Sequence, residues 1–157
     1  MIRELVLVRH GDAEFVGPEG TDASRRLTKK GREVLQAAYP ETFARLRDVD
    51  DVHLWVSPAV RAVETAEIVE SAGVCFVDKD VHKSLYEQDD EGFLAELEAE
   101  GEGCVVAVGH IPFMERMLYQ LTGDDVKFGK GAVASVTFKK GNLRRGRLSW
   151  FIQGPKA

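Results

Sequence analysis

Apolar residues follow two patterns along this chain. Short, mostly apolar runs have the length and composition of buried strands, and they lie at residues 2–8, 52–56, 74–77 and 104–108. Longer stretches repeat their apolar residues at helical spacing, and they lie at residues 31–47, 58–73, 89–100 and 111–122. Two more strands are predicted at residues 132–138 and 148–152, joined by a hairpin-like connection. The alternation predicts an α/β sandwich with a mostly parallel sheet and an antiparallel pair at the end.

Local signals refine the ends of the predicted helices. Pro40 is expected to kink or interrupt the helix over residues 31–47. Ser57 and Pro58 predict a helix start, with serine at the N-cap and proline at the first helical position. Gly123 is expected to close the helix that begins near residue 111. With 157 residues and no internal linker, residues 1–157 are predicted to form a single domain.

Composition and charge narrow the class of protein. The net charge of −5 argues against nucleic acid or an anionic membrane as the main partner. No stretch reaches the length of a membrane span and no signal-peptide pattern is present, so the cytoplasm is the expected location. In that compartment Cys75 and Cys104 are predicted to be buried reduced thiols.

Polar clusters follow three of the predicted strands directly. They are Arg9-His10-Gly11 after the first strand, Ser57-Pro58 with Arg61 after the second, and Gly109-His110 after the fourth. In open α/β sheets, ligands bind at the carboxyl ends of the strands. If these strands are parallel neighbours, two arginines and two histidines converge on one pocket.

Such a pocket suits phosphoryl transfer. Guanidinium groups match the oxygens of a phosphoryl group bidentately, and a neutral imidazole can form a covalent phosphohistidine. Nearby arginines keep the imidazole unprotonated, and a second histidine can donate hydrogen bonds as charge builds. Arg61 is expected in the first turn of its helix, where the dipole also favours an anion, and Gly11 is expected to let the ligand approach closely.

Several segments resemble the histidine phosphatase superfamily. LVRHGDAE resembles its RHG signature, SPAVRAVETA at residues 57–66 resembles SPxxRAxxTA, and GH at 109–110 resembles its third element. RRLTKKG at residues 25–31 is similar to the RPLTxxG segment of SixA-like phosphohistidine phosphatases. GHIPFMERMLYQLTG and GAVASVTF are similar to the C-terminal third of that subfamily. The resemblance covers nearly the whole chain.

The resemblance implies a role for each matching residue. His10 would be the nucleophile, and Arg9, Arg61 and His110 would complete the phosphate pocket. Arg25 would add a contact to the substrate, although Arg26 replaces the proline of the family segment. The family uses no metal or other cofactor, and its fold is a three-layer α/β/α sandwich of the phosphoglycerate mutase type.

Glu87 is a candidate proton donor. Leu85-Tyr86-Glu87 resembles an L-x-E segment with which larger members of the superfamily protonate the leaving group. An alkoxide leaving group needs such an acid, whereas the imidazole of a phosphohistidine can leave without one. A Glu87 side chain in the pocket would favour phosphoesters, and one facing solvent would favour phosphohistidine.

Three functions are kept as alternatives. The first is a metal-independent phosphatase acting on phosphohistidine in a signalling protein of the histidine-containing phosphotransfer type. The segments between motifs leave little chain for a lid, and an open site fits such a substrate. The second is a phosphatase of small phosphoesters, and the third is a catalytically silent module that binds phosphorylated partners.

Other polar residues are expected to have structural roles and not catalytic ones. His53 and His82 match no motif and are expected to be surface or hydrogen-bonded histidines. A zinc site is not expected, because no metal-ligand spacing is present and the arginines would repel a cation. RRGR at residues 144–147 is expected to be a solvated hairpin tip.

Overall fold

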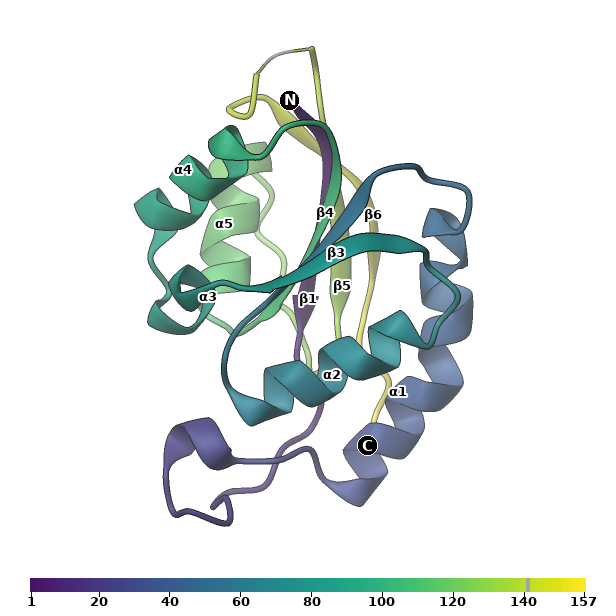
Figure 1. Cartoon of the computed structure of the whole chain (residues 1–157), viewed down its shortest axis with the longest axis vertical. Helices are drawn as coiled ribbons and strands as arrows, with labels where there is room; N and C mark the ends of the chain where they lie inside the picture. Colours follow the sequence, from purple (N-terminus) through teal and green to yellow (C-terminus); the bar gives the residue numbers. More distant parts are fainter. Residues whose placement is uncertain (141) are drawn as a thin grey trace.

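A six-stranded sheet forms the centre of the protein (Figure 1). The computed structural model describes residues 1–140 and 142–157. The strands are β1 (Ile2–Arg9), β2 (Val52–Val56), β3 (Phe76–Val81), β4 (Gly103–Gly109), β5 (Val133–Phe138) and β6 (Gly146–Ile152). Their order is β3-β2-β4-β1-β5-β6, with parallel pairing from β3 to β1 and antiparallel pairing of β5 with both its neighbours. The predicted mostly parallel sheet with antiparallel pairing near the C-terminus is confirmed.

Helices cover both faces of the sheet and give the three layers. They are α1 (Lys29–Thr42), α2 (Val60–Glu70), α3 (Lys83–Glu87), α4 (Asp90–Ala99) and α5 (Phe113–Thr122). Figure 1 shows α1 and α2 on one side of the sheet and α3, α4 and α5 on the other. None of the helices in the described ranges is both long and apolar enough to cross a membrane.

The alternation of side chains along β1 explains how one strand supports two cores. Val6 and Val8 pack with residues of α1 and α2, whereas Leu5 and Leu7 pack with residues of α4 and α5. Successive side chains of a strand point to opposite faces, so a central strand covered on both faces must be apolar throughout. The unbroken apolar run at the start of the chain therefore results from burial on both sides.

Two predicted elements differ from the structure. Pro40 lies inside α1, which continues to Thr42 and then into a 3₁₀ helix over Phe43–Leu46. Because Pro40 falls in the last turn of α1, only the end of the helical bonding is affected. The third strand was predicted at residues 74–77 but runs over Phe76–Val81 as an exposed edge of the sheet, where polar residues are tolerated. Cys75 is accordingly exposed, so its predicted burial is wrong, while Cys104 is buried as predicted.

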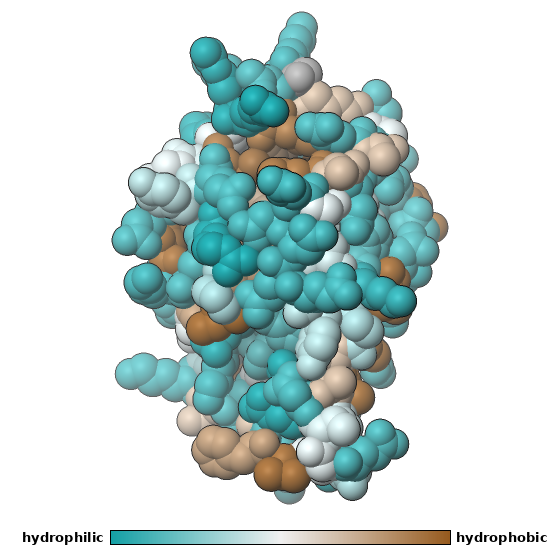
Figure 2. Space-filling model, turned by 90° about the vertical axis from the view of Figure 1, so that its left-hand side faces the viewer, coloured by the Kyte–Doolittle hydropathy of each residue, from teal (hydrophilic) through white to brown (hydrophobic). Residues whose placement is uncertain are grey.

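A long loop extends beyond the carboxyl ends of the strands. It joins β1 to α1 and contains a 3₁₀ helix over Asp22–Ser24, where the hydroxyl of Thr21 accepts a hydrogen bond from the Ser24 amide at 3.3 Å. The loop carries the exposed apolar residues Phe15 and Val16. Figure 2 shows a mostly hydrophilic face with apolar atoms near its top, at its side edges and at its lower end, and the lower end is where Figure 1 draws this loop.

Candidate active site

The three predicted polar clusters meet at one edge of the sheet. In the register of β1 and β4, Arg9 lies opposite Gly109, so Arg9-His10 and Gly109-His110 leave the sheet side by side. Ser57 follows β2 on the other side of β4, and its amide donates to the Val108 carbonyl at 3.0 Å. Neighbouring parallel strands thus bring these residues together, as the sequence predicted.

An open hollow of about 720 Å³ lies over this edge. Its lining includes Arg9, His10, Asp22, Arg25, Arg61 and His110, and these residues define what is called the active-site hollow below. Three guanidinium groups and two imidazole rings are part of this lining, which is the chemistry of an anion-binding site. No group of three histidine, cysteine or carboxylate side chains suited to a metal ion occurs among the described residues.

His10 is held with one ring nitrogen free for chemistry. Its amide donates to the Gly109 carbonyl and its carbonyl accepts from the Gly131 amide, both at 3.0 Å. Its Nδ1 lies 2.7 Å from the carbonyl oxygen of Gly11. A carbonyl only accepts, so Nδ1 carries the hydrogen and Nε2 keeps its lone pair.

The surroundings of His10 keep its ring neutral. Burial lowers the pKa of His10 to about 3, and the positive charges of Arg61 and Arg9 act in the same direction, against the hydrogen bond to Gly11. Burial and the Arg61 charge likewise lower the pKa of His110 to about 4. Both rings are therefore neutral near pH 7, and His10 can act as a nucleophile.

Arg61 joins the parts of the site. It lies in the first turn of α2, as predicted, and its side chain is buried. Its Nε donates to Nε2 of His10 at 3.3 Å, and one terminal nitrogen lies 3.5 Å from Nδ1 of His110. The other terminal nitrogen donates to the backbone carbonyl of Asp22 at 2.8 Å. One guanidinium thus contacts both histidines and the long loop.

Ser57 serves His110 instead of capping the helix. The predicted helix start at Ser57-Pro58 is wrong, because α2 begins at Val60 and its N-cap, Ala59, makes no side-chain hydrogen bond. The Ser57 hydroxyl lies 2.8 Å from Nε2 of His110. With Nδ1 of His110 facing the Arg61 donor, Nε2 carries the hydrogen and donates to Ser57.

Arg9 brings a second guanidinium to the hollow. One terminal nitrogen donates to the Phe128 carbonyl at 2.9 Å. Its Nε is buried and has no hydrogen-bond partner within residues 1–140 and 142–157. Burial lowers the pKa of Arg9, but an arginine remains protonated in proteins. Arg9 therefore brings a positive charge to the lining of the hollow and carries a buried donor that the described residues leave unsatisfied.

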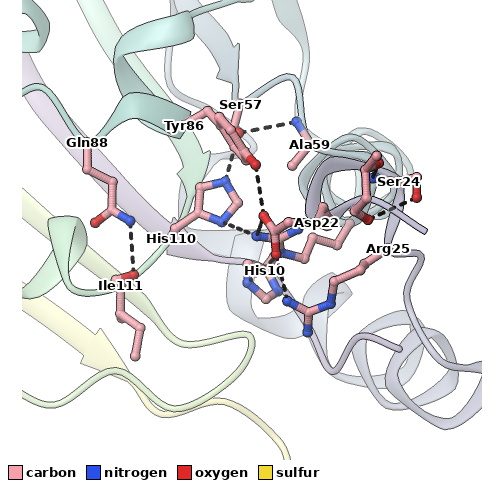
Figure 3. A network of polar contacts seen from close by, with 12 residues as sticks. His10, Asp22, Ser24, Arg25, Ser57, Ala59, Tyr86, Gln88, His110 and Ile111 are labelled. Atoms are coloured by element: carbon pink, nitrogen blue, oxygen red, sulfur yellow. Dashed lines mark hydrogen bonds and ion pairs between the residues drawn. The ribbon is translucent and has the colours of Figure 1, made fainter. Parts of the chain in front are cut away.

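Two residues of the hollow, Asp22 and Tyr86, were missed by the sequence analysis. The Asp22 carboxylate accepts from Arg61 at 3.1 Å, from Arg25 at 3.1 Å and from the Tyr86 hydroxyl at 2.8 Å (Figure 3). The length of the loop after β1 was the available signal for Asp22. Arg25 lines the hollow, in agreement with its position in the family segment.

Glu14 and Arg26 hold the loop where the family segment has proline. The Arg26 side chain donates twice to the Glu14 carboxylate, at 3.0 Å each, and the Arg26 amide donates to the same carboxylate at 3.1 Å. A proline would lack that amide hydrogen. This bidentate pair and its backbone bond fix the segment that carries Arg25.

Gly11 and Glu87 are not brought to the reacting groups in the way the sequence suggested. A Cβ at Gly11 would lie 2.7 Å from Cδ1 of Leu35, so core packing favours a glycine there, and Gly11 is not among the residues that line the hollow. Glu87 is exposed and is not among the residues that line the hollow, whereas its neighbours Tyr86 and Gln88 are. A helix turns by about 100° per residue, which separates Tyr86 from Glu87.

The remaining histidines are hydrogen-bonded outside the site. Nδ1 of His53 lies 3.0 Å from the carboxylate oxygens of Asp78, and His82 contacts the Glu96 carboxylate while stacking on Trp55. Their prediction as hydrogen-bonded histidines without a motif is confirmed.

Fold and site together define an α/β protein with a phosphate-type anion site at the carboxyl ends of its parallel strands. Residues 5–90 match the sequence profile of the histidine phosphatase superfamily (branch 1). The chain belongs to this superfamily, as its motifs indicated.

Solved structures with the same fold extend the comparison to nearly the full chain. The protein histidine phosphatase SixA complexed with tungstate superposes with a TM-score of 0.77 at 24% identity, covering 96% of each chain. The putative phosphohistidine phosphatase SixA from Agrobacterium tumefaciens gives 0.77 at 24% identity, covering 96% of this chain and 97% of that one. The putative SixA from Nakamurella multipartitia gives 0.75 at 25% identity, covering 97% and 96%. A comparison with curated protein sequences found no significant match.

Proposed function

We propose that this protein is a phosphohistidine phosphatase that works through a covalent intermediate on His10. The observation that carries the proposal is the neutral His10 ring, whose unprotonated Nε2 lies 3.3 Å from Nε of Arg61, in a hollow that Arg9 and Arg25 also line. A nucleophile next to oxyanion donors is the arrangement that phosphoryl transfer to histidine requires. The likeness to SixA structures, one of them a complex with the tetrahedral oxyanion tungstate, supports the same chemistry.

The proposed reaction has two displacement steps. Nε2 of His10 attacks phosphorus while the P–N bond to the substrate imidazole breaks, and the departing imidazole takes a proton from solvent. Water then attacks the phosphoryl group on His10, which releases inorganic phosphate, returns neutral imidazole and passes one proton to solvent. Arg9, Arg61 and Arg25 would hold the phosphoryl oxygens, and His110 would donate from Nδ1 once the bound anion favours its protonation.

Two features favour phosphohistidine over a phosphoester. Three carboxylates line the hollow, Asp12, Glu14 and Asp22, and Glu87 lies outside it. Hydrogen bonds from Lys130 and Arg26 lower the pKa of Asp12 and of Glu14, and the Tyr86 hydrogen bond with Arg25 and Arg61 lowers the pKa of Asp22 to about 2, so none of the three is suited to protonating an alkoxide. An imidazole leaving group does not depend on such an acid. The exposed side chain of Phe15 also lines the hollow, and it offers an apolar contact to a protein surface that carries the phosphohistidine.

A substrate panel in the presence of EDTA tests this proposal. It compares a phosphorylated histidine-containing phosphotransfer protein, phosphoserine, a sugar phosphate and p-nitrophenyl phosphate by kcat/KM. We expect the phosphohistidine protein to be preferred by at least about 100-fold, and His10→Ala to abolish turnover of it. His53→Gln is the matched control, since it removes a histidine outside the hollow and should leave turnover intact.

Rapid quenching with a radiolabelled substrate tests the intermediate itself. We expect an acid-labile, base-stable phosphoryl group on the wild-type protein and none on His10→Ala. Preference for the small esters would support a phosphoester phosphatase instead. Binding of the phosphorylated partner with neither turnover nor a trapped intermediate would support a silent binding module.

A further inference from the structure

The Asp22 carboxylate takes up donors that the active-site hollow offers to an anion. One of its oxygens accepts from Arg61 at 3.1 Å and from the Tyr86 hydroxyl at 2.8 Å, and the other accepts from Arg25 at 3.1 Å. Figure 3 shows the carboxylate between His10, His110 and Arg25. Two oxygens on two guanidinium groups form the same kind of contact that a phosphoryl group would make.

The Arg61 nitrogen that contacts this carboxylate also faces His110. It lies 3.1 Å from the Asp22 carboxylate and 3.5 Å from Nδ1 of His110. A phosphoryl group seated on His10 beside His110 would need that same donor. The carboxylate and a bound phosphoryl group also carry like charges, so they cannot share the donor without repulsion.

We propose that Asp22 is an intramolecular competitor for the phosphoryl site, which it occupies in the free protein and must release when a phosphorylated substrate or free phosphate binds. The inference rests on the proposed function, because it takes the hollow to be the phosphoryl site. Its consequence is weaker binding of the product: the carboxylate returns to the guanidinium groups as inorganic phosphate leaves.

The loop allows the carboxylate to leave while its backbone stays in place. The Asp22 side chain is 52% exposed, so rotation about its side-chain bonds brings the carboxylate into solvent. The Asp22 backbone is held independently, because its carbonyl accepts from Arg61 at 2.8 Å and from the Arg25 amide at 3.2 Å. Arg61 therefore stays oriented when the carboxylate moves, and Tyr86 is left with a free hydroxyl.

The same separation makes an isosteric substitution informative. Asp22→Asn keeps the size of the side chain and the backbone carbonyl that orients Arg61, and it removes the negative charge. If the carboxylate served only to position Arg61, its loss would weaken anion binding. If the carboxylate competes with the anion, its loss should strengthen anion binding.

Titration calorimetry with inorganic phosphate near pH 7.5 provides the test. We expect Asp22→Asn to bind phosphate roughly tenfold more tightly than the wild type, since the Asp22 ion pairs and a like-charge repulsion no longer oppose binding. Asp22→Ala should shift the dissociation constant in the same direction. Asp12→Asn is the matched control, because Asp12 lines the same hollow but pairs with Lys130 at 2.6 Å, and its effect should stay within about threefold.

Each outcome decides between the two proposals. Equal or weaker phosphate binding by both Asp22 variants, with the wild type binding normally, would overturn the competitor role and leave the proposed function standing. If Asp12→Asn bound phosphate more tightly by the same factor as Asp22→Asn, the change in net charge would account for the gain in affinity. That result would also overturn the competitor role. Failure of all four proteins to bind phosphate would instead remove the phosphoryl site on which both proposals stand.

Discussion

The Nε–H of Arg61 points at the free nitrogen of His10, 3.3 Å from Nε2. This contact connects the first turn of α2 to the residue that directly follows β1. A fixed cation at this distance discourages protonation of the imidazole and marks where phosphoryl oxygens would gather. The contact depends on the fork shape of the guanidinium, since other nitrogens of the same group face His110 and the Asp22 carbonyl.

Arg61→Lys should therefore lower activity even though it keeps the charge. One ammonium group cannot span His10, His110 and the Asp22 carbonyl together. We expect kcat/KM on a phosphohistidine protein to fall about 100- to 1,000-fold, as for the loss of a donor to a developing oxyanion.

Arg32→Lys supplies the control for this substitution. Arg32 pairs with Glu64 at 2.8 Å and does not line the active-site hollow, so this variant should stay within about twofold of the wild type. If Arg61→Lys also stayed within that range, the fork geometry would have no part in turnover.

Ser57→Ala should reduce turnover by releasing His110. The Ser57 hydroxyl faces Nε2 of His110 at 2.8 Å and fixes which ring nitrogen carries the hydrogen. Without it, a buried N–H loses its partner, which costs about 1–3 kcal/mol of stability. We expect kcat to fall roughly tenfold, and nitrogen NMR of His110 should report a mixture of tautomers.

Ser84→Ala separates the tautomer effect from a general loss of stability. Ser84 is also buried and donates to the Glu96 carboxylate at 3.0 Å, away from the hollow. It should lower the unfolding free energy while leaving kcat unchanged. A wild-type kcat and a single His110 tautomer in Ser57→Ala would contradict the role given to Ser57.

Pattern and motif were sufficient to predict where the two arginines and two histidines meet. Apolar runs identify the strands, and the order of parallel strands brings Arg9, His10 and His110 to one edge, because Arg9 ends β1 and the two histidines directly follow β1 and β4. Arg61 follows from the helix that starts after β2. These positions depend on short-range spacing and on the general geometry of a parallel sheet.

The rest of the site depends on contacts that local sequence does not encode. Asp22 is placed by Arg61, thirty-nine residues further along the chain. Ser57 has the sequence features of a helix cap, yet its hydroxyl is taken by His110, fifty-three residues away. A three-residue motif does not specify which side of the short helix α3 faces the hollow. In the structure that side carries Tyr86 and not Glu87. Tertiary partners override local preference in each case.

Glu87→Gln should leave the hydrolysis of phosphohistidine unchanged. Its carboxylate is exposed and outside the hollow, and the imidazole leaving group needs no acid from the protein. We expect kcat to stay within about twofold of the wild type from pH 6 to pH 8. A loss of tenfold or more, concentrated in kcat at the lower pH, where more of a carboxyl group is protonated, would assign Glu87 the proton-donor role predicted from its L-x-E segment.

The buried histidines should make the fold sensitive to mild acid. Burial lowers the pKa of His10 to about 3 and that of His110 to about 4, whereas both would titrate near 6.5 in the unfolded chain. Above pH 6.5 neither state binds the proton, so the two groups have no effect there. Between pH 6.5 and about 4 only the unfolded state takes up protons, and the unfolding free energy therefore falls as pH falls. At pH 5 each histidine should lower it by roughly 2 kcal/mol.

Urea unfolding of wild type and His10→Gln at pH 7 and pH 5 isolates this effect. Glutamine does not titrate, so the loss of stability between the two pH values should be smaller in the variant by roughly 2 kcal/mol. His53→Gln should have the opposite effect on the loss of unfolding free energy between pH 7 and pH 5. The Asp78 hydrogen bond and nearby carboxylates outweigh burial and raise the pKa of His53. Its raised pKa adds stability at low pH that is lost as pH rises, so removing it should steepen the acid loss. Identical pH slopes in the wild type and His10→Gln would mean that His10 takes up its proton as readily in the folded protein as in the unfolded chain, which would contradict a nucleophile kept neutral by burial.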